Sequence, residues 1–282
     1  MILIADSGST KTDWRLQDEN KKIHQFRTIG FNPRFHSTQE ISNAIAQDLV
    51  PKIEADKISN VYYYGVACSS PDKIQIVSDA LKENIKNAKI EVNHDLLGAA
   101  RSLCQHHEGM VAILGTGSNS CYYDGENIRE NITSLGYILG DEGGGAYMGM
   151  KLIKCYLENE LPPDLHQLFY QKYKLDKDEI LDSVYSKPLP IKFFGSFTPF
   201  LLHNIRNPFI NKLVYDSFLA FFKKQICKYS KHKEVKLSCT GSIAFYFVDI
   251  LKQVASDCNV SLDRVIETPI AGLTLYHCPD SF

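Results

Sequence analysis

The chain has 282 residues, of which 31 are Lys or Arg and 33 are Asp or Glu, so its formal charge is -2 with histidine neutral. This near balance argues against a protein that binds nucleic acid through a basic surface. Hydrophobic residues make up 44% of the chain and charged residues 23%, as in an ordinary globular protein. At about 150 residues per domain, this length predicts two domains.

The cysteines and the N-terminus bear on the compartment. The eight cysteines are scattered, with no C-x-x-C pair and no histidine cluster beside them, so neither a zinc site nor a disulfide framework is indicated. Residues 1–6 have no basic region and do not resemble a signal peptide. Apolar stretches such as 218–222 are far shorter than the roughly 18 residues of a membrane span. We therefore expect a soluble, cytoplasmic protein in a reducing compartment.

The first hundred residues predict alternating strands and helices. Runs of β-branched and aromatic residues indicate strands, and the capping-box pair Ser37 and Glu40 indicates a helix that ends before Pro51. These signals predict the order βββαβαβα, with strands at 2–6, 12–16 and 23–29, a helix after Ser37, a strand at 61–66, a helix at 71–85, a strand at 90–92 and a helix at 96–103.

The strand and small-residue turn at the start of the chain recur later. An apolar strand at 111–114 leads into Gly-Thr-Gly-Ser-Asn at 115–119, a second strand at 120–123 and an Asp-Gly hairpin signal before Ile128. Residues 3–10 have the same layout. The likeness is either a coincidence between common hairpins or a duplication. In a duplication the two turns would line a cleft between similar halves, where ligands usually bind.

Helices predominate after residue 140. The pattern predicts helices at 146–157, 165–173, 178–185 and 208–229, a strand at 235–239, a helix at 243–255, a strand at 265–267 and a closing helix at 270–277. We therefore expect two domains: residues 1–107, onto which residues 270–282 pack back, and residues 108–269, which carry a helical insertion.

The first turn places a carboxylate at a strand end and follows it with small residues. In the segment Asp-Ser-Gly-Ser-Thr-Lys-Thr at 6–12, backbone N–H groups and hydroxyls can approach an anion, as phosphate binding requires. The segment is not a P-loop, because it lacks the G-x-x-x-x-G-K-[ST] spacing and a following helix. A tight hairpin without a ligand is the alternative.

Two further segments are rich in small residues. Residues 115–119 directly follow an apolar strand, and Gly241 and Ser242 stand between a strand and a helix, where a helix N-terminus can face a nucleotide. Plain turns are the alternative for both. The symmetric placement of 115–119 relative to the first turn favours phosphate contact.

The three segments together resemble a known set of motifs. Residues 6–12, 115–119 and 240–242 are similar to the phosphate-1, phosphate-2 and adenosine motifs of the sugar kinase, Hsc70 and actin superfamily. Within it the chain resembles the N-acetylglucosamine kinase and BadF/BadG/BcrA/BcrD-type ATPase family over essentially its whole length. The sharpest match is GYILGDEGGGA at 136–146, similar to the family's G-x-x-x-G-D-E-G-S-x segment. The resemblance implies an α/β fold class: two RNase H-like, actin-like ATPase domains, each with a βββαβαβα mixed sheet, around a central nucleotide cleft.

The resemblance also implies roles for individual residues. Asp95 matches the catalytic aspartate, which accepts the proton of the sugar hydroxyl and contacts the sugar, although an N-cap role is the alternative. Asp6 would hold Mg²⁺ through water. The residues implied to bind ATP are Ser7, Gly8, Ser9, Thr10, Lys11, Gly115, Thr116, Gly117, Ser118, Gly241, Ser242 and Phe245. The residues implied to bind the sugar, besides Asp95, are Asn32, Ser69, Asn119, Ser134, Leu135, Gly136 and Asp141.

Some of these positions have alternatives, and some depart from the family pattern. Asn32 is equally a turn residue before proline, and Asp141 lies where a solvated turn is also expected. Serines stand where many relatives have glycine, as in Asp-Ser-Gly-Ser-Thr, and each added side chain narrows the space for a phosphate or a ribose. Leu135 stands near the position where many eukaryotic relatives have a tryptophan beside the sugar. The sequence therefore predicts the identity of the sugar less strongly than it predicts the fold.

The resemblance implies an ATP- and Mg²⁺-dependent kinase that phosphorylates N-acetylglucosamine at its 6-hydroxyl. Glucosamine and N-acetylmuramic acid are alternative sugars, and the chain is compatible with a homodimer. A second hypothesis is an ATPase activator that couples hydrolysis to electron transfer through an iron–sulfur cluster, for which Cys104 and Cys121 are the only candidates by position. A third is a catalytically silent sugar-binding relative. Neither nucleic acid nor a membrane is an expected partner.

Overall fold

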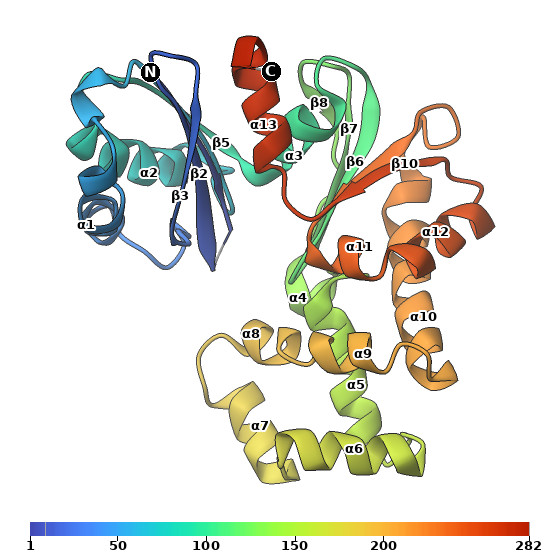
Figure 1. Cartoon of the computed structure of the whole chain (residues 1–282). Helices are drawn as coiled ribbons and strands as arrows, with labels where there is room; N and C mark the ends of the chain where they lie inside the picture. Colours follow the sequence, from blue (N-terminus) through green and yellow to red (C-terminus); the bar gives the residue numbers. More distant parts are fainter. Residues whose placement is uncertain (9, 282) are drawn as a thin grey trace. The chain divides into compact units, whose positions relative to one another are not determined.

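The computed structural model describes residues 1–8 and 10–281, so the predicted ATP-binding residue Ser9 lies outside the described residues. The chain divides into two compact units. Unit 1 contains Met1–His107, Tyr123–Ile128 and Thr268–Phe282, and unit 2 contains Glu108–Tyr122 and Arg129–Glu267. Two five-stranded sheets organise the chain (Figure 1).

The first sheet joins an antiparallel meander to two parallel strands. Its order is β3 (Ile23–Ile29), β2 (Lys11–Gln17), β1 (Ile2–Ser7), β4 (Asn60–Gly65) and β5 (Lys89–His94). Strands β1, β4 and β5 are parallel, with Asp6 opposite Tyr64 and Tyr64 opposite Asn93. Because parallel strands run in the same direction, the carboxyl ends of these three meet at one edge of the sheet.

Helices cover both faces of this sheet. On one face α1 (Thr38–Asp48) and α2 (Pro71–Asn84) enclose a core that includes Trp14 and Tyr63, and the predicted Ser37 and Glu40 capping box is present at α1. On the other face lie α3 (Asp95–Cys104) and α13 (Ile270–His277), side by side (Figure 1). The predicted order βββαβαβα is therefore confirmed in unit 1.

The second sheet repeats the arrangement of the first. Its order is β10 (Leu262–Ile266), β9 (Leu237–Thr240), β6 (Gly109–Leu114), β7 (Ser118–Tyr123) and β8 (Ile128–Glu130). Counted from the first strand of each sheet, both have the spatial order 3-2-1-4-5. This equivalence agrees with the predicted repeat. The cleft predicted between the two halves stays a prediction.

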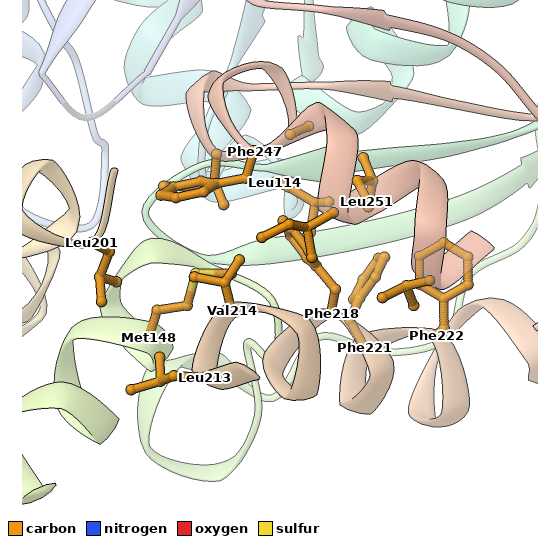
Figure 2. Close-up of a cluster of buried hydrophobic side chains, with 14 of the residues drawn as sticks. Leu114, Met148, Leu201, Leu213, Val214, Phe218, Phe221, Phe222, Phe247 and Leu251 are labelled. Atoms are coloured by element: carbon orange, nitrogen blue, oxygen red, sulfur yellow. The ribbon is translucent and has the colours of Figure 1, made fainter. Parts of the chain in front are cut away.

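The remaining helices of the chain belong to unit 2. Aromatic side chains of α10 (Pro208–Lys224), among them Phe218, Phe221 and Phe222, pack with Met148 of α5 (Gly145–Leu157) and Leu251 of α12 (Val248–Asp257) in one core (Figure 2). The helices are α4 (Gly136–Leu139), α5 (Gly145–Leu157), α6 (Pro163–Tyr173), α7 (Lys177–Tyr185), α8 (Pro190–Gly195), α9 (Thr198–His203), α10 (Pro208–Lys224), α11 (Ser242–Tyr246) and α12 (Val248–Asp257).

Several predicted boundaries in unit 2 are wrong. The helix predicted at 208–229 ends at Lys224, and a short 3-10 turn at Ile226–Lys228 follows it. The helix predicted at 243–255 is two helices, because the buried Phe247 leaves helical geometry between them. Helices α4 and α8 were not predicted, although Pro190 opens the first turn of α8. Within residues 1–8 and 10–281, no helix has both the length and the apolar character to cross a membrane.

Candidate active site

Two carboxylates lie at the carboxyl ends of parallel strands in unit 1. Asp6 is near the end of β1, and Asp95 directly follows β5. Strand β4 lies between them, so the two strand ends are about 10 Å apart, twice the spacing of neighbouring strands. Burial raises the pKa of Asp6 to about 7, and the charges of Asp95 and Asp13 act in the same direction. Burial also raises the pKa of Asp95.

Asp95 is not the N-cap of α3, so the N-cap role expected as the alternative for this residue is wrong. The cap is His94, whose Nδ1 accepts a hydrogen bond from the backbone N–H of Leu97 at 3.2 Å. Asp95 occupies the first helical position, where its Oδ1 accepts from the backbone N–H of Leu96 at 2.9 Å. Because His94 satisfies the helix end, the second carboxylate oxygen of Asp95 is not needed for capping. Histidine is not among the preferred N-cap residues, so the sequence carries no signal for this role.

The described residues contain no group of three or more His, Cys, Asp or Glu side chains that could hold a metal ion, so a magnesium ion here would depend on one or two carboxylates and on water. Mg²⁺ binds oxygen ligands and usually takes only one or two carboxylates while keeping several waters. Asp6 and Asp95 interact electrostatically, and the positive charge that lowers the pKa of Asp6 is Lys11. The Lys11 ammonium lies 3.1 Å from Asp13, which it shares with Arg27. A divalent cation would therefore relieve the repulsion between two partly buried carboxylates.

The first turn keeps its serine side chain away from the exposed loop. Ser7 Oγ is 2.8 Å from Thr12 Oγ1 and accepts from the backbone N–H of Phe31 at 3.3 Å. Its side chain is only 1% exposed. The expectation that a serine at this position narrows the phosphate space is therefore wrong for Ser7, because the side chain points into the protein.

The tip of the first turn is exposed and tightly closed. Gly8 N–H donates to the carbonyl of Lys11, and Gly30 N–H donates to the carbonyl of Thr10, both at 3.0 Å. Both Gly8 and Thr10 are exposed. A Cβ on Gly30 would lie 2.3 Å from the Gly8 carbonyl oxygen. Gly30, which the sequence analysis missed, thus allows β3 to end against the turn.

Two predicted sugar-binding residues lie in loops of unit 1. Asn32 is 8% exposed, and its Oδ1 accepts from the backbone N–H of Arg34 at 3.0 Å. The turn role expected for Asn32 is therefore present, and its sugar contact stays a prediction. Ser69 is exposed in the loop between β4 and α2.

The second glycine-rich turn, in unit 2, is fastened to the start of α5. The backbone N–H groups of Gly145 and Ala146 donate to the carbonyls of Gly115 and Thr116, at 2.8 and 2.9 Å. Thr116 is exposed at the tip. Ser118 Oγ is buried and, among the described residues, has no hydrogen-bond partner. An orphaned hydroxyl of this kind is unusual in a folded protein and is a candidate ligand contact.

Asp141 is a buried, strained carboxylate beside this turn. Its φ is 55°, a left-handed conformation that is uncommon outside glycine, and the residue is 7% exposed. Asp141 Oδ1 accepts from Ser134 Oγ at 2.9 Å. Burial raises the pKa of Asp141, opposed by hydrogen bonds from Ser134 and the Ser118 backbone. A Cβ on Gly117 would lie 2.5 Å from Asp141 Oδ2, so the structure brings Gly117, Ser134 and Asp141 together.

The sequence analysis missed the partner that holds the Asp141 loop. Glu142 is only 4% exposed, although a solvated turn was the alternative there, and Lys224 Nζ lies 2.5 Å from its Oε1. Lys224 ends α10, 82 residues away in the sequence. A pair this distant leaves no local signal. The other sugar-binding candidates of this unit include exposed Leu135, at 59%, and Asn119, whose Oδ1 accepts from the Ser120 backbone N–H at 2.9 Å.

The third predicted segment has a structural requirement of its own. Gly241 has a φ of 113°, and a Cβ there would lie 2.3 Å from the carbonyl oxygen of Leu114. Glycine is therefore needed for β9 to lead into α11 beside β6. Ser242 and Phe245 are exposed on α11.

Comparison with known proteins adds independent evidence. A search with family models finds no match. A curated N-acetylmuramic acid/N-acetylglucosamine kinase from Clostridium acetobutylicum is 25% identical over 167 residues, which cover 56% of this chain. The match spans about half of that relative's length, 54%.

Solved structures match over essentially the whole chain. A candidate N-acetylglucosamine kinase from Porphyromonas gingivalis has a TM-score of 0.94 at 40% identity and covers 100% of both chains. A second, from Chromobacterium violaceum, has a TM-score of 0.73 at 16% identity, covering 98% of both. A ROK family glucokinase from Streptomyces griseus, bound to glucose and AMPPNP, has a TM-score of 0.55 at 12% identity and covers 99% of this chain and 98% of its own.

The two equivalent sheets and these neighbours define the fold of the chain as the actin-like ATPase fold. The predicted fold class is thus confirmed. At 40% identity over both whole chains, the chain belongs to the N-acetylglucosamine kinase family.

Proposed function

We propose that this protein transfers the γ-phosphoryl group of ATP to the 6-hydroxyl of an amino sugar, with N-acetylglucosamine as the first candidate. The observation that carries the proposal is the 40% identity, over the whole chain, to the candidate N-acetylglucosamine kinase from Porphyromonas gingivalis. The curated Clostridium relative, named for both N-acetylmuramic acid and N-acetylglucosamine, makes N-acetylmuramic acid the second candidate.

Asp95 is the proposed base. Phosphoryl transfer depends mostly on positioning and charge neutralisation, with one carboxylate that orients the attacking hydroxyl and accepts its proton. The raised pKa of Asp95 makes it a better proton acceptor than an ordinary exposed aspartate. Its Oδ1 is held by the Leu96 backbone, which supports a fixed direction for the carboxylate.

Asp6 is the proposed holder of Mg²⁺, through water. When bound, the ion would neutralise charge on the phosphates of ATP. We assign the exposed turns at Gly8, Thr10 and Lys11 in unit 1, and at Thr116 in unit 2, to the phosphates. The remaining proposed nucleotide contacts are Ser7, Gly115, Gly117, Ser118, Gly241, Ser242 and Phe245.

Asp141 is the proposed anchor for sugar hydroxyls. A buried carboxylate held by Ser134 can accept hydrogen bonds from hydroxyls, and binding would compensate for its desolvation. Asn32, Ser69, Asn119, Leu135 and Gly136 are the other proposed sugar contacts.

A coupled assay of ADP release, run with N-acetylglucosamine, N-acetylmuramic acid, glucosamine and glucose, tests the proposal. We expect sugar-dependent release, with the highest kcat/KM for N-acetylglucosamine. 6-Deoxy-N-acetylglucosamine lacks the acceptor oxygen and should release no ADP. Silence with every sugar would contradict the kinase proposal, and turnover of the 6-deoxy sugar would contradict the position of transfer.

The base is tested by Asp95→Asn. We expect kcat to fall by about 10²- to 10⁴-fold, because the variant cannot accept the proton. Asp178→Asn, on the exposed surface in the first turn of α7, is the matched control and should keep wild-type turnover. Retention of most sugar-dependent ADP release in Asp95→Asn would rule out Asp95 as the base.

A further inference from the structure

A polar network lies under α3 and α13 in unit 1 and includes none of the residues assigned above. Arg101 Nη1 donates to the Tyr64 hydroxyl at 2.6 Å and to Glu91 Oε1 at 3.1 Å. The same Tyr64 hydroxyl is 2.8 Å from His277 Nε2. Arg101 of α3, Tyr64 of β4 and His277 of α13 together form what we call the Arg101–Tyr64–His277 network.

The donors in this network have one consistent direction. A guanidinium has no acceptor, so Arg101 donates and the Tyr64 oxygen accepts. The Tyr64 hydroxyl can then donate to Nε2 of His277, which accepts this bond in the tautomer protonated at Nδ1. Burial, with the nearby charge of Arg101, lowers the pKa of His277 to about 4, so the ring is neutral near pH 7 and can accept this bond.

The network is partly buried, and one of its nitrogen atoms has no hydrogen-bond partner among the described residues. Tyr64 is fully buried, and the ring of His277 stacks on Tyr62 with centroids 3.8 Å apart. The guanidinium of Arg101 lies 5.3 Å from the ring centre of Tyr276. Among the described residues, Arg101 Nε is buried without a hydrogen-bond partner, which is a cost that a purely apolar contact would avoid.

Close contacts fasten α3 to its neighbours on both sides. A Cβ on Gly98 would lie 2.8 Å from Cβ of Tyr64, so α3 touches β4 at the residue that carries the network. Ser102 Oγ donates to the carbonyl of Pro269 at 2.7 Å, just before α13. A Cβ on Gly272 would lie 2.3 Å from Ser102 Oγ. Helix α3 therefore packs closely against both β4 and α13.

The same residues connect to both carboxylates of the candidate site. Tyr64 is the register partner of Asp6 on β1 and of Asn93 on β5, and Asp95 is the first residue of α3. We propose that the Arg101–Tyr64–His277 network positions Asp95 relative to Asp6 for phosphoryl transfer. Tyr64, Arg101 and His277 are then positioning residues, and α13, near the end of the chain, is part of the catalytic apparatus. The inference rests on the proposed function.

Two pairs of variants test the network. Tyr64→Phe removes only the hydroxyl, and Tyr62→Phe is its matched control on the same strand and the same sheet face. His277→Phe keeps the ring stacked on Tyr62 but removes the acceptor, and His277→Gln restores a hydrogen-bonding group at that position. The measurements are kcat, the KM values for ATP and sugar, and amide hydrogen exchange in the first turn of α3, at Leu96 and Leu97.

If the network positions Asp95, Tyr64→Phe and His277→Phe lower kcat by about tenfold or more, because small misplacements of a reacting group are costly. Both KM values stay within about twofold, since substrate binding is not removed. Exchange at the start of α3 rises. Tyr62→Phe stays close to the wild type, and His277→Gln recovers most of kcat.

Other outcomes overturn the proposal. A lower Tm with wild-type kcat and wild-type exchange at α3 would make the network merely structural, as would equal losses in Tyr64→Phe and Tyr62→Phe. If Tyr64→Phe does not fold, the comparison of His277→Phe with His277→Gln tests the proposal instead. If the wild-type protein turns over no sugar, the proposed function fails, and the exchange data alone decide whether the network holds the start of α3.

Discussion

At the scale of single residues, the candidate site departs from what stability alone would favour. Asp141 combines a left-handed backbone with a buried carboxylate, and Ser118 buries a hydroxyl that has no partner among the described residues. Each feature lowers the free energy of unfolding, and a ligand that hydrogen-bonds to the group would offset this loss. Strain and desolvation of this kind concentrate where proteins bind and react.

Replacing Asp141 by Asn separates stability from function. The raised pKa means that the folded state holds the Asp141 proton more tightly than the unfolded state. The carboxyl therefore stabilises the fold at low pH, and this stabilisation is lost as the pH rises through the folded pKa. Asn removes the buried charge and tolerates the left-handed conformation. We expect Asp141→Asn to raise Tm at pH 8 more than at pH 4.5.

The same variant should lose sugar affinity. A hydrogen bond to a charged group contributes about 1.5–3 kcal/mol, so kcat/KM for the sugar should fall by about 10- to 100-fold. Calorimetry at both pH values and steady-state kinetics are the measurements. A Tm that falls at pH 8, or an unchanged kcat/KM, would contradict the assignment.

Gly241 is expected to be intolerant of a side chain for reasons of packing. Gly241→Ala places a Cβ 2.3 Å from the Leu114 carbonyl at a φ of 113°, so unfolding free energy should fall by roughly 2–4 kcal/mol. Gly115→Ala is the control, because among the described residues no atom beyond its chain neighbours would lie within 4 Å of the new Cβ, and its stability should change by less than about 0.5 kcal/mol. Urea unfolding measures both, and equal effects would refute the packing argument.

At the scale of elements, α3 depends on an unusual cap. His94 accepts the Leu97 N–H, so His94→Ala should lower the unfolding free energy by about 1 kcal/mol, whereas His94→Asn keeps an acceptor and should not. Burial lowers the pKa of His94, against the charge of Asp95. The cap therefore stabilises the fold fully above the unfolded pKa of about 6.5 and loses this effect as the pH falls.

The pH dependence of stability is a second test of the His94 cap. We expect His94→Asn to lose less stability than the wild type between pH 7.5 and pH 5.5, as measured by urea unfolding at each pH. Parallel losses in the two proteins would show that His94 protonation does not act on the helix end.

At the scale of the whole molecule, the last helix belongs by packing to unit 1, beside the first strand. Leu273 is fully buried in a cluster with Ile4 and Tyr64. Leu273→Ala should cost about 2–5 kcal/mol and raise hydrogen exchange in β1 and β4 without raising it in β6. Leu275→Ala, in the same helix but 43% exposed, is the control and should leave exchange unchanged. Faster exchange in β6 alone would contradict this assignment.

Much of the architecture was predictable because its signals are local. The capping box at Ser37 and the alternation of strands and turns depend on neighbouring residues, and unit 1 has the predicted order of elements. The proline at the start of α8 is a local signal that was not used, whereas the break at Phe247 accompanies its burial in the core, which local patterns do not record.

The sequence by itself determined the order of elements in unit 1, the family motifs and the placement of Asp6 and Asp95 at strand ends, since each follows from contiguous residues. Only the tertiary structure decided that His94 caps α3, that Lys224 holds Glu142, and that Tyr64 joins Arg101 to His277. The last two depend on residues separated by tens to hundreds of positions along the chain. Burial and hydrogen bonding between such residues exist only once the chain has folded.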